Sequence, residues 1–154
     1  MRILAADIGT VRLGLAVSDP MGMTAQPLPT IDGGTAKQVS KSILKIVLEY
    51  ENTNSEKQKI KTVVIGNPIH LDGSESDMSQ MAKECVRLLK EYFKQNFTRE
   101  IDLILQDERL TSVAAEKVLL SADLSRKKRK QIKDRVAAQL ILQNYLDILS
   151  LQSN

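Results

Sequence analysis

The sequence contains a single cysteine, a single histidine and no long apolar run. Because Cys85 has no partner in the chain, it excludes an internal disulfide and a cysteine-rich zinc cluster. Met78, Met81, Cys85 and Leu89 follow one another at helical spacing, so we expect Cys85 in the core rather than at a reactive site. One histidine and no serine at a nucleophile elbow also exclude a Ser/His/Asp triad.

The chain also lacks the segments that direct a protein to a membrane or to secretion. No apolar stretch approaches the ~20 residues of a membrane helix, and the N-terminus has neither the apolar region nor the cleavage site of a secretory signal. Hydrophobic residues make up 42% and charged residues 27%, which is typical of a soluble protein. We therefore expect a cytoplasmic protein without a membrane partner, and 154 residues predict one domain, 1–154.

Charge is distributed unevenly along the chain. The net charge is +3 and the pI is near 9.0, yet residues 126–135 hold seven basic side chains and one acid, a net +6. The rest of the chain therefore carries −3. A protein that binds nucleic acid through a diffusely basic surface is excluded, whereas one basic segment remains to be explained.

Hydrophobic periodicity predicts an α/β fold. Three strands in hairpin succession come first, followed by alternating helices and strands. This order predicts one mixed sheet of three antiparallel strands and then two parallel ones, with helices on both faces. Asp77 is the expected N-cap of the second helix. The predicted strands are 2–6, 13–18, 25–31, 62–65 and 101–105. The predicted helices are one around 39–47, then 78–93, 113–120 and 132–149, with 121–130 as a basic connector.

Acidic residues follow two of the predicted strands. Asp7 ends the first strand and precedes Gly9 and Thr10, and its carboxylate could meet a ligand at the edge of the sheet or simply cap the turn. Asp107 and Glu108 follow the fifth strand, where either acid could instead favour the positive end of the next helix.

A third acid lies on the last helix. Asp134 shares a helix face with Ala137, Ala138 and Ile141, which are small or apolar and allow close packing on the sheet. A carboxylate carried inward there needs a partner, either a neighbouring cation or a metal ion. Together with Asp7 and Glu108 it would form an oxygen-rich pocket suited to Mg²⁺ or Mn²⁺, which supports phosphodiester hydrolysis by activating water and neutralising phosphate charge.

Four segments of the chain resemble the YqgF family, also called RuvX, of ribonuclease-H-like bacterial nucleases. They are residues 7–19, 66–73, 107–112 and 134–142, and they occur in the family's order over essentially the whole chain. The resemblance implies a ribonuclease-H-like fold in which Asp7, Glu108 and Asp134 occupy the metal-binding, catalytic positions. It also implies processing of the 5′ end of precursor 16S ribosomal RNA, with resolution of four-way DNA junctions as the alternative.

Three positions depart from the family pattern. Val11, Asn67 and His70 stand where the family usually has Lys, Leu and Asn. The first change leaves Arg12 as the only cation of the first loop. His70 could serve as a proton shuttle, but we favour a solvated loop residue because a metal-activated water needs no side-chain base.

The basic segment is the predicted contact with nucleic acid. Such contacts position a strand without reading its sequence, and about five of them would give a logarithmic salt slope near −4. Arg109 could clamp the scissile phosphate or pair with Asp107. Arg12 and Arg109 join Arg126, Lys127, Lys128, Arg129 and Lys130 as predicted nucleic-acid-binding residues.

Other functions fit parts of the pattern. Actin-like sugar kinases share the Asp-Gly-Thr turn, but their two-domain fold requires a longer chain. A non-catalytic ribosome-assembly factor that binds RNA through the basic segment remains open. A junction resolvase needs a two-fold dimer, so we expect a monomer or a homodimer according to the substrate.

Overall fold

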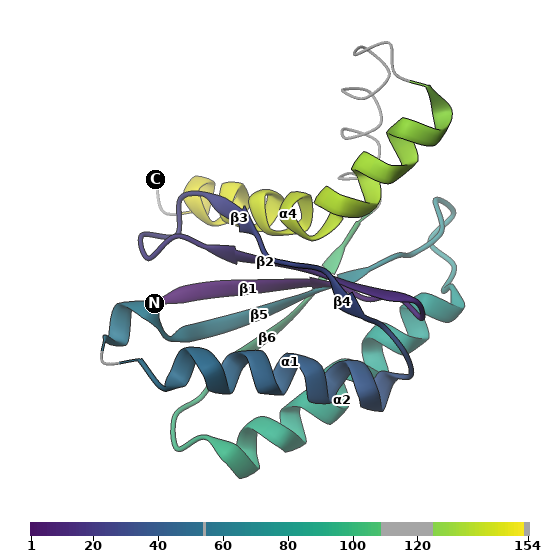
Figure 1. Cartoon of the computed structure of the whole chain (residues 1–154). Helices are drawn as coiled ribbons and strands as arrows, with labels where there is room; N and C mark the ends of the chain where they lie inside the picture. Colours follow the sequence, from purple (N-terminus) through teal and green to yellow (C-terminus); the bar gives the residue numbers. More distant parts are fainter. Residues whose placement is uncertain (54, 109–124, 153–154) are drawn as a thin grey trace.

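The computed structural model describes residues 1–53, 55–108 and 125–152, and within 126–135 it describes the backbone alone. The strands are β1 (Arg2–Asp7), β2 (Arg12–Ser18), β3 (Ala25–Pro27), β4 (Ile31–Asp32), β5 (Ile60–Asn67) and β6 (Asp102–Asp107). The helices are α1 (Ala36–Glu51), the 3₁₀ turn η1 (Glu56–Gln58), α2 (Asp77–Asn96) and α4 (Arg126–Gln152). Figure 1 shows their arrangement.

The strands form one mixed sheet in the order β3-β2-β1-β5-β6, with β4 pairing separately with β2. The pairs β3–β2 and β2–β1 are antiparallel, whereas β1–β5 and β5–β6 are parallel. The predicted change from antiparallel to parallel pairing is confirmed. Because β1, β5 and β6 run in the same direction, their carboxyl ends meet at one edge of the sheet, called the carboxyl edge below.

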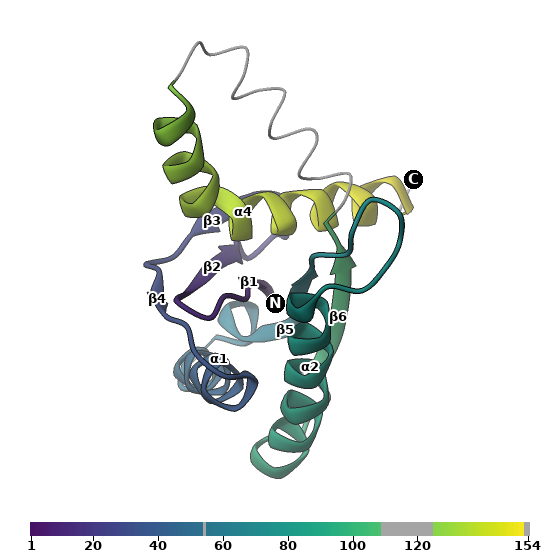
Figure 2. The same ribbon diagram turned by 90° about the vertical axis from the view of Figure 1, so that its right-hand side faces the viewer.

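Helices cover both faces of the sheet, as predicted (Figures 1 and 2). On one face, α1 and α2 pack on alternate strand residues such as Leu4 and Ile65. On the other, α4 packs through Ala138, Ile141 and Leu142 on a patch that includes Ala5, Ala16 and Val64. Alanines on both sides of this interface allow α4 to lie close to the strands.

The starts of the two helices on the first face are fixed by side-chain caps. Thr35 and Gln38 form a capping box at the start of α1. At α2, the N-cap is Ser76, whose Oγ accepts from the backbone N–H of Ser79. The predicted N-cap, Asp77, is therefore wrong by one residue, and Asp77 instead provides a negative charge in the first turn.

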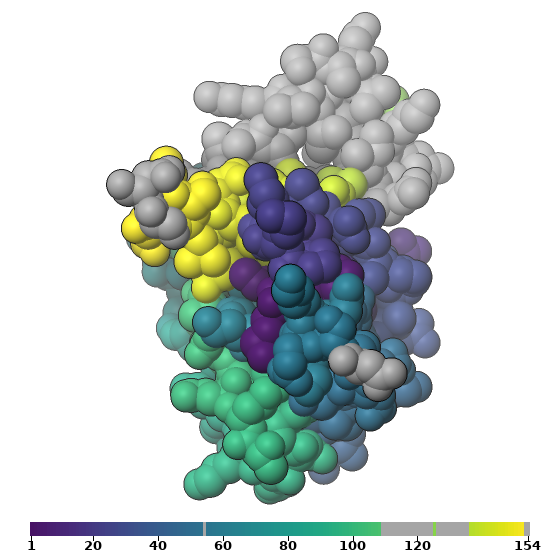
Figure 3. Space-filling view, turned by 90° about the vertical axis from the view of Figure 1, so that its left-hand side faces the viewer, coloured from purple at the N-terminus to yellow at the C-terminus, as the bar shows by residue number. Residues whose placement is uncertain are grey.

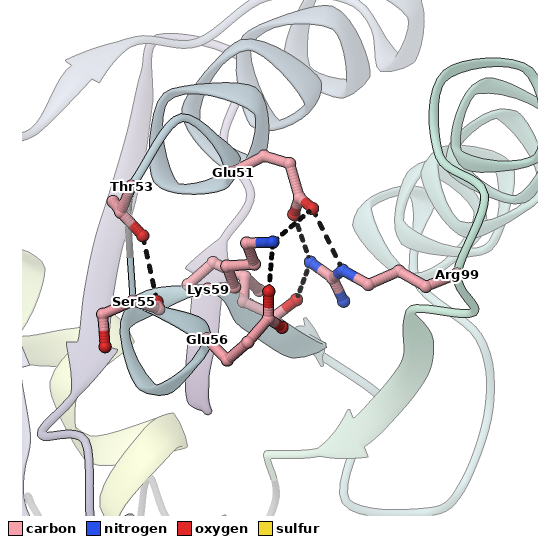
Figure 4. Close-up of polar contacts among 7 residues, drawn as sticks. Glu51, Thr53, Ser55, Glu56, Lys59 and Arg99 are labelled. Carbon is pink, nitrogen blue, oxygen red and sulfur yellow. Dashed lines mark hydrogen bonds and ion pairs between the residues drawn. The ribbon is translucent and has the colours of Figure 1, made fainter.

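A charged cluster ties three elements together at the edge opposite the carboxyl ends (Figure 4). Arg99, between α2 and β6, donates from Nη2 to Glu51 Oε2 at 2.5 Å and to the Ile60 carbonyl at 2.8 Å. Lys59 lies 3.5 Å from Glu51 and 2.5 Å from Glu56. The end of α1, the start of β5 and the approach to β6 are thereby joined.

The remaining differences from the predicted elements are local. The predicted strand 25–31 divides into β3 and β4, because Pro27 and Pro29 have no N–H to continue the ladder. The predicted connector is also wrong in part, since residues 126–130 are helical and begin α4. The predicted helix 113–120 lies outside the described residues. Cys85 is fully buried, as predicted, and burial raises the pKa of its thiol.

Candidate active site

Asp7 lies at the carboxyl edge on the face covered by α4. It ends β1 and pairs across the ladder with Gly14 of β2. A β-carbon built on Gly14 would lie 3.4 Å from the β-carbon of Asp7 and 3.6 Å from that of Ala138. Asp7 is therefore adjacent to the point where α4 crosses the end of the β1–β2 hairpin.

Glu108 approaches the same face from the other side. A β-carbon on Gly66 of β5 would overlap with Glu108 Oε1 and would lie 2.7 Å from Ile141 Cδ1. The Glu108 carboxylate thus lies over the neighbouring strand, beside α4. Because β5 stands between β6 and β1, this orientation turns Glu108 toward the strand that carries Asp7.

Asp134, the third predicted ligand, is carried by α4. It lies four residues before Ala138, which is one helical turn, so it occupies the same side of the helix axis as the residue that packs beside Asp7. Its side chain is outside the described part of the structure. The fold therefore brings the backbone of all three predicted positions to one edge, and for Asp7 and Glu108 it also places the side chains.

Asp107 is directed differently from Glu108. Successive strand residues face opposite sides of a sheet, and Leu105, two residues earlier, packs in the core beneath α1 and α2. Asp107 therefore faces that side, in register with Asn67 of β5. Of the two adjacent acids, Glu108 is the one that shares a face with Asp7.

Sequence reasoning missed Asn67 as part of this edge. Asn67 ends β5 and is 7% exposed, and its Oδ1 accepts from Ser79 Oγ at 2.6 Å. Its backbone carbonyl accepts from the Glu108 N–H at 3.3 Å. The rule that selected Asp7 and Glu108, a polar residue at the end of a buried parallel strand, also selects Asn67.

Two loops border the carboxyl edge (Figure 2). The β1–β2 turn carries Val11 and then Arg12, which is exposed. The loop between β5 and α2 carries His70, also exposed, as expected for a solvated residue. In that loop Asp72 accepts from Ser74 Oγ and N–H, and these bonds lower the pKa of the Asp72 carboxyl.

The predicted cations are placed only in part. Residues 126–130 form the start of α4, so this basic segment leads directly into the helix that carries Asp134. The side chains of that segment, and Arg109 altogether, lie outside the described residues.

The described side chains alone do not complete a metal site. Within them, no three His, Cys, Asp or Glu side chains come together as a ligand set. Asp7 and Glu108 nevertheless provide hard oxygen donors of the kind that Mg²⁺ and Mn²⁺ bind, and Asp134 would be the third. The donor chemistry therefore fits a divalent cation.

Comparison with known proteins identifies the class. The fold is ribonuclease-H-like. Thermus thermophilus RuvC, solved in complex with a Holliday junction substrate, superposes with a TM-score of 0.52 at 14% identity, covering 92% of each chain. No helix in the described part is long and apolar enough to span a membrane.

Sequence comparison then gives the family. A family model described as RuvX, Holliday junction resolvase, matches residues 1–148. Two Clostridium botulinum proteins, of strains Eklund 17B and Hall, each named "Putative pre-16S rRNA nuclease", are 42% and 43% identical over 150 residues, which is 97% of this chain and 99% of theirs. The chain belongs to the RuvX family, and it is a nuclease, a hydrolase of phosphodiester bonds.

Proposed function

We propose that this protein is a Mg²⁺- or Mn²⁺-dependent nuclease that processes the 5′ end of precursor 16S ribosomal RNA in the cytoplasm, with Asp7, Glu108 and Asp134 as metal ligands. The observation that carries the proposal is the position of Glu108. Its carboxylate lies over Gly66 and beside α4, the helix that also contacts the Asp7 position. One acid that ends β1 and one that follows β6 thus both lie beside the same helix, α4.

The carboxylates have a defined task in this proposal. A divalent cation held there would lower the pKa of a water molecule and offset the negative charge on the reacting phosphate. Asp7 and Glu108 supply anionic oxygen at the sheet, and Asp134 supplies it from the helix. The glycines beneath two of these positions, Gly14 and Gly66, leave room for that arrangement.

Cations beside the carboxylates would hold the substrate strand. Arg12 is exposed at the start of β2, next to the Asp7 turn. The basic segment 126–130 precedes Asp134 by about one turn of α4. We assign both, together with Arg109, to contacts with phosphates, which position a strand irrespective of its sequence.

Precursor ribosomal RNA is the proposed substrate because the relatives named for it align over nearly the whole chain at 42–43% identity. A four-way DNA junction is the second candidate, which the description of the family model favours. The two differ in symmetry, because paired cuts in a junction require a two-fold dimer. A protein that stays monomeric on its substrate supports the RNA assignment.

A comparative cleavage assay tests the proposal. Wild type and Asp7→Asn are incubated with precursor 16S RNA and with a four-way DNA junction, with Mg²⁺ or with a chelator. We expect wild type with Mg²⁺ to cut the RNA, and Asp7→Asn to bind it without cutting. Binding by wild type without cleavage of either substrate would instead assign the chain as a non-catalytic assembly factor.

A further inference from the structure

Large apolar side chains are exposed at both ends of the sheet. At the carboxyl edge, Val11 is 77% exposed and Leu71 is 82% exposed. At the opposite edge, the β2–β3 turn exposes Met21 at 80% and Met23 at 65%. That turn lies against the C-terminal half of α4 (Figure 3), where Gln143 bonds the Met23 carbonyl. The two pairs are similar in exposure and differ in their distance from the carboxylates.

Val11 and Leu71 are called the apolar tips below. The first of them, Val11, belongs to a turn with a fixed backbone. The Val11 carbonyl accepts from the Gly33 N–H at 3.0 Å, and the Gly9 carbonyl accepts from the Gly34 N–H at 3.3 Å. A β-carbon on Gly33 would overlap with the Gly9 carbonyl, so the two segments are in direct contact. The turn therefore holds Val11 outward instead of allowing it to fold onto the core.

The second tip is held in the same way by its own loop. The backbone carbonyl of His70 accepts from the Gly73 N–H at 2.9 Å, and the backbone N–H of His70 donates to the Ser74 carbonyl at 3.0 Å. Asp72 closes the turn through two bonds from Ser74, at 2.9 and 2.6 Å. These hydrogen bonds hold the residues on either side of Leu71, whose side chain is exposed to water.

These tips lie in loops on either side of the carboxyl edge (Figure 2). In a nucleic acid, the apolar surfaces are the faces of the bases. Base faces are hidden by stacking and pairing in a duplex and become accessible when nucleotides are unpaired. Apolar side chains such as Leu also act as wedges between bases. Phosphates are exposed in both duplex and single-stranded nucleic acid, so binding of phosphate charge alone would not require exposed apolar side chains.

We propose that Val11 and Leu71 contact the bases of unpaired nucleotides flanking the scissile phosphate, so that the enzyme selects single-stranded or locally melted substrate. This inference rests on the proposed nuclease function and names the strand conformation that the site accepts. Arg12, adjacent to Val11, places a cation for the phosphate beside an apolar contact for its base. Selection then follows from the exposed base faces, with little dependence on base identity.

Binding without cleavage tests the inference. A short oligoribonucleotide with 2-aminopurine at its centre is titrated with protein in chelator, alone and annealed as a blunt duplex. Wild type should bind the single strand at least about tenfold more tightly than the duplex and change its 2-aminopurine fluorescence. The double variant Val11→Ser/Leu71→Ser should lose about tenfold on the single strand and little on the duplex.

Matched variants separate this role from a general loss of surface. Met21→Ser/Met23→Ser removes similarly exposed apolar side chains at the far edge and should bind both RNAs as wild type does. Leu71→Phe, which keeps an apolar contact, should retain the preference for single strands. The inference would be overturned if Val11→Ser/Leu71→Ser lost the same affinity for the single strand and the duplex, or if the methionine variant lost as much affinity as it does. A protein partner would then be the remaining candidate to contact Val11 and Leu71.

The test is independent of catalysis. Because cleavage is blocked by the chelator, a strand preference that depends on Val11 and Leu71 would stand even if neither substrate were cut with Mg²⁺. Conversely, Mg²⁺-dependent cleavage by wild type with no strand preference would support the nuclease and overturn this inference alone.

Discussion

The carboxylate of Glu108 occupies the space that a β-carbon would take on Gly66 of the neighbouring strand. The same space is bounded by Ile141 of α4. Gly66, the residue before the last one of β5, therefore sets how far Glu108 can turn toward β1. Side-chain placement at this site depends on a residue that carries no functional group.

Gly66→Ala should disturb the site more than the fold. The added methyl overlaps with Glu108 Oε1 and crowds Ile141 Cδ1, so the carboxylate must move. Because both clashing atoms are the ends of flexible side chains, we expect a loss of at most about 1 kcal/mol in unfolding free energy, and a fall in kcat of at least about tenfold. Chemical denaturation and single-turnover cleavage measure the two effects.

Gly14→Ala is the matched control for that substitution. Its β-carbon would meet the β-carbons of Asp7 and Ala138 at 3.4 and 3.6 Å, which is ordinary van der Waals contact. It should change stability and kcat less than Gly66→Ala does. A Gly14→Ala variant that is the more damaged of the two would contradict the assigned geometry.

The buried Asn67–Ser79 pair should be coupled both in stability and in activity. Ser79→Ala removes the hydroxyl that donates to Asn67 Oδ1 at 2.6 Å, which should cost about 1–3 kcal/mol because a buried acceptor loses its partner. A double-mutant cycle with Asn67→Ala should give a coupling of about 1 kcal/mol.

Cleavage should also slow in Ser79→Ala, since the Asn67 carbonyl holds the Glu108 N–H. Ser40→Ala is the control, because Ser40 is equally buried but bonds the Cys85 carbonyl at 3.4 Å between α1 and α2. A similar loss of activity in the Ser40 variant would assign the effect to general destabilisation.

The Arg99 cluster should make stability depend on acid pH. The hydrogen bond from Arg99 lowers the pKa of Glu51 in the folded protein below its ordinary 4.5. Ionised Glu51 therefore favours folding above that ordinary value, and its contribution is lost as pH falls through the lower folded-state pKa. Arg99→Met should lower the free energy of unfolding by about 1–2 kcal/mol at neutral pH. It should also flatten the acid limb, which is the fall of unfolding free energy as pH drops below neutrality.

Arg87→Met provides the comparison for the Arg99 prediction. Arg87 pairs with Glu84 and Glu91 on the surface of α2, and its side chain is 55% exposed. Exposed pairs contribute little to stability, so this variant should unfold at nearly the same urea concentration as wild type. Urea melts between pH 3 and 7 measure both variants, and an unchanged acid limb in Arg99→Met would contradict the assignment.

Neutralising residues 126–130 with glutamine should weaken RNA binding and flatten its salt dependence. If these side chains contact about five phosphates, the logarithmic slope should become shallower by about 4, and the slope that remains should reflect the contacts of Arg12 and Arg109. The control variant removes the same number of positive charges elsewhere, by changing five other lysines to glutamine: Lys37, Lys41, Lys45, Lys90 and Lys94. An equal effect of the two sets on the slope would remove the basic segment from the interface.

The sequence predicted strand ends well because they depend on local chemistry. Asp7 and Glu108 were selected as candidates because each follows a short apolar run, and runs of this kind form buried parallel strands. The roles of Gly14 and Gly66 were not predictable, because a close approach depends on where α4 crosses the sheet. That position is set by long-range packing of Ala138 and Ile141.

The misplaced boundaries have local causes. Ser76 and Asp77 are both good N-caps, and the hydrogen bond from the Ser79 N–H selects Ser76. The segment 126–130 reads as a connector by its charge, yet Lys and Arg are good helix formers and no Gly or Pro interrupts them before α4 continues. Charge pattern alone thus misjudged where the helix begins.

The most direct test of the central claim compares two adjacent acids. Glu108→Gln and Asp107→Asn each remove one charge at the end of β6, but the first side chain faces α4 and Asp7, and the second faces the opposite side. Mg²⁺-dependent cleavage of precursor 16S RNA is measured for both. We predict at least about 100-fold loss for Glu108→Gln and less than about fivefold for Asp107→Asn; equal activity of the two variants would contradict the proposed site.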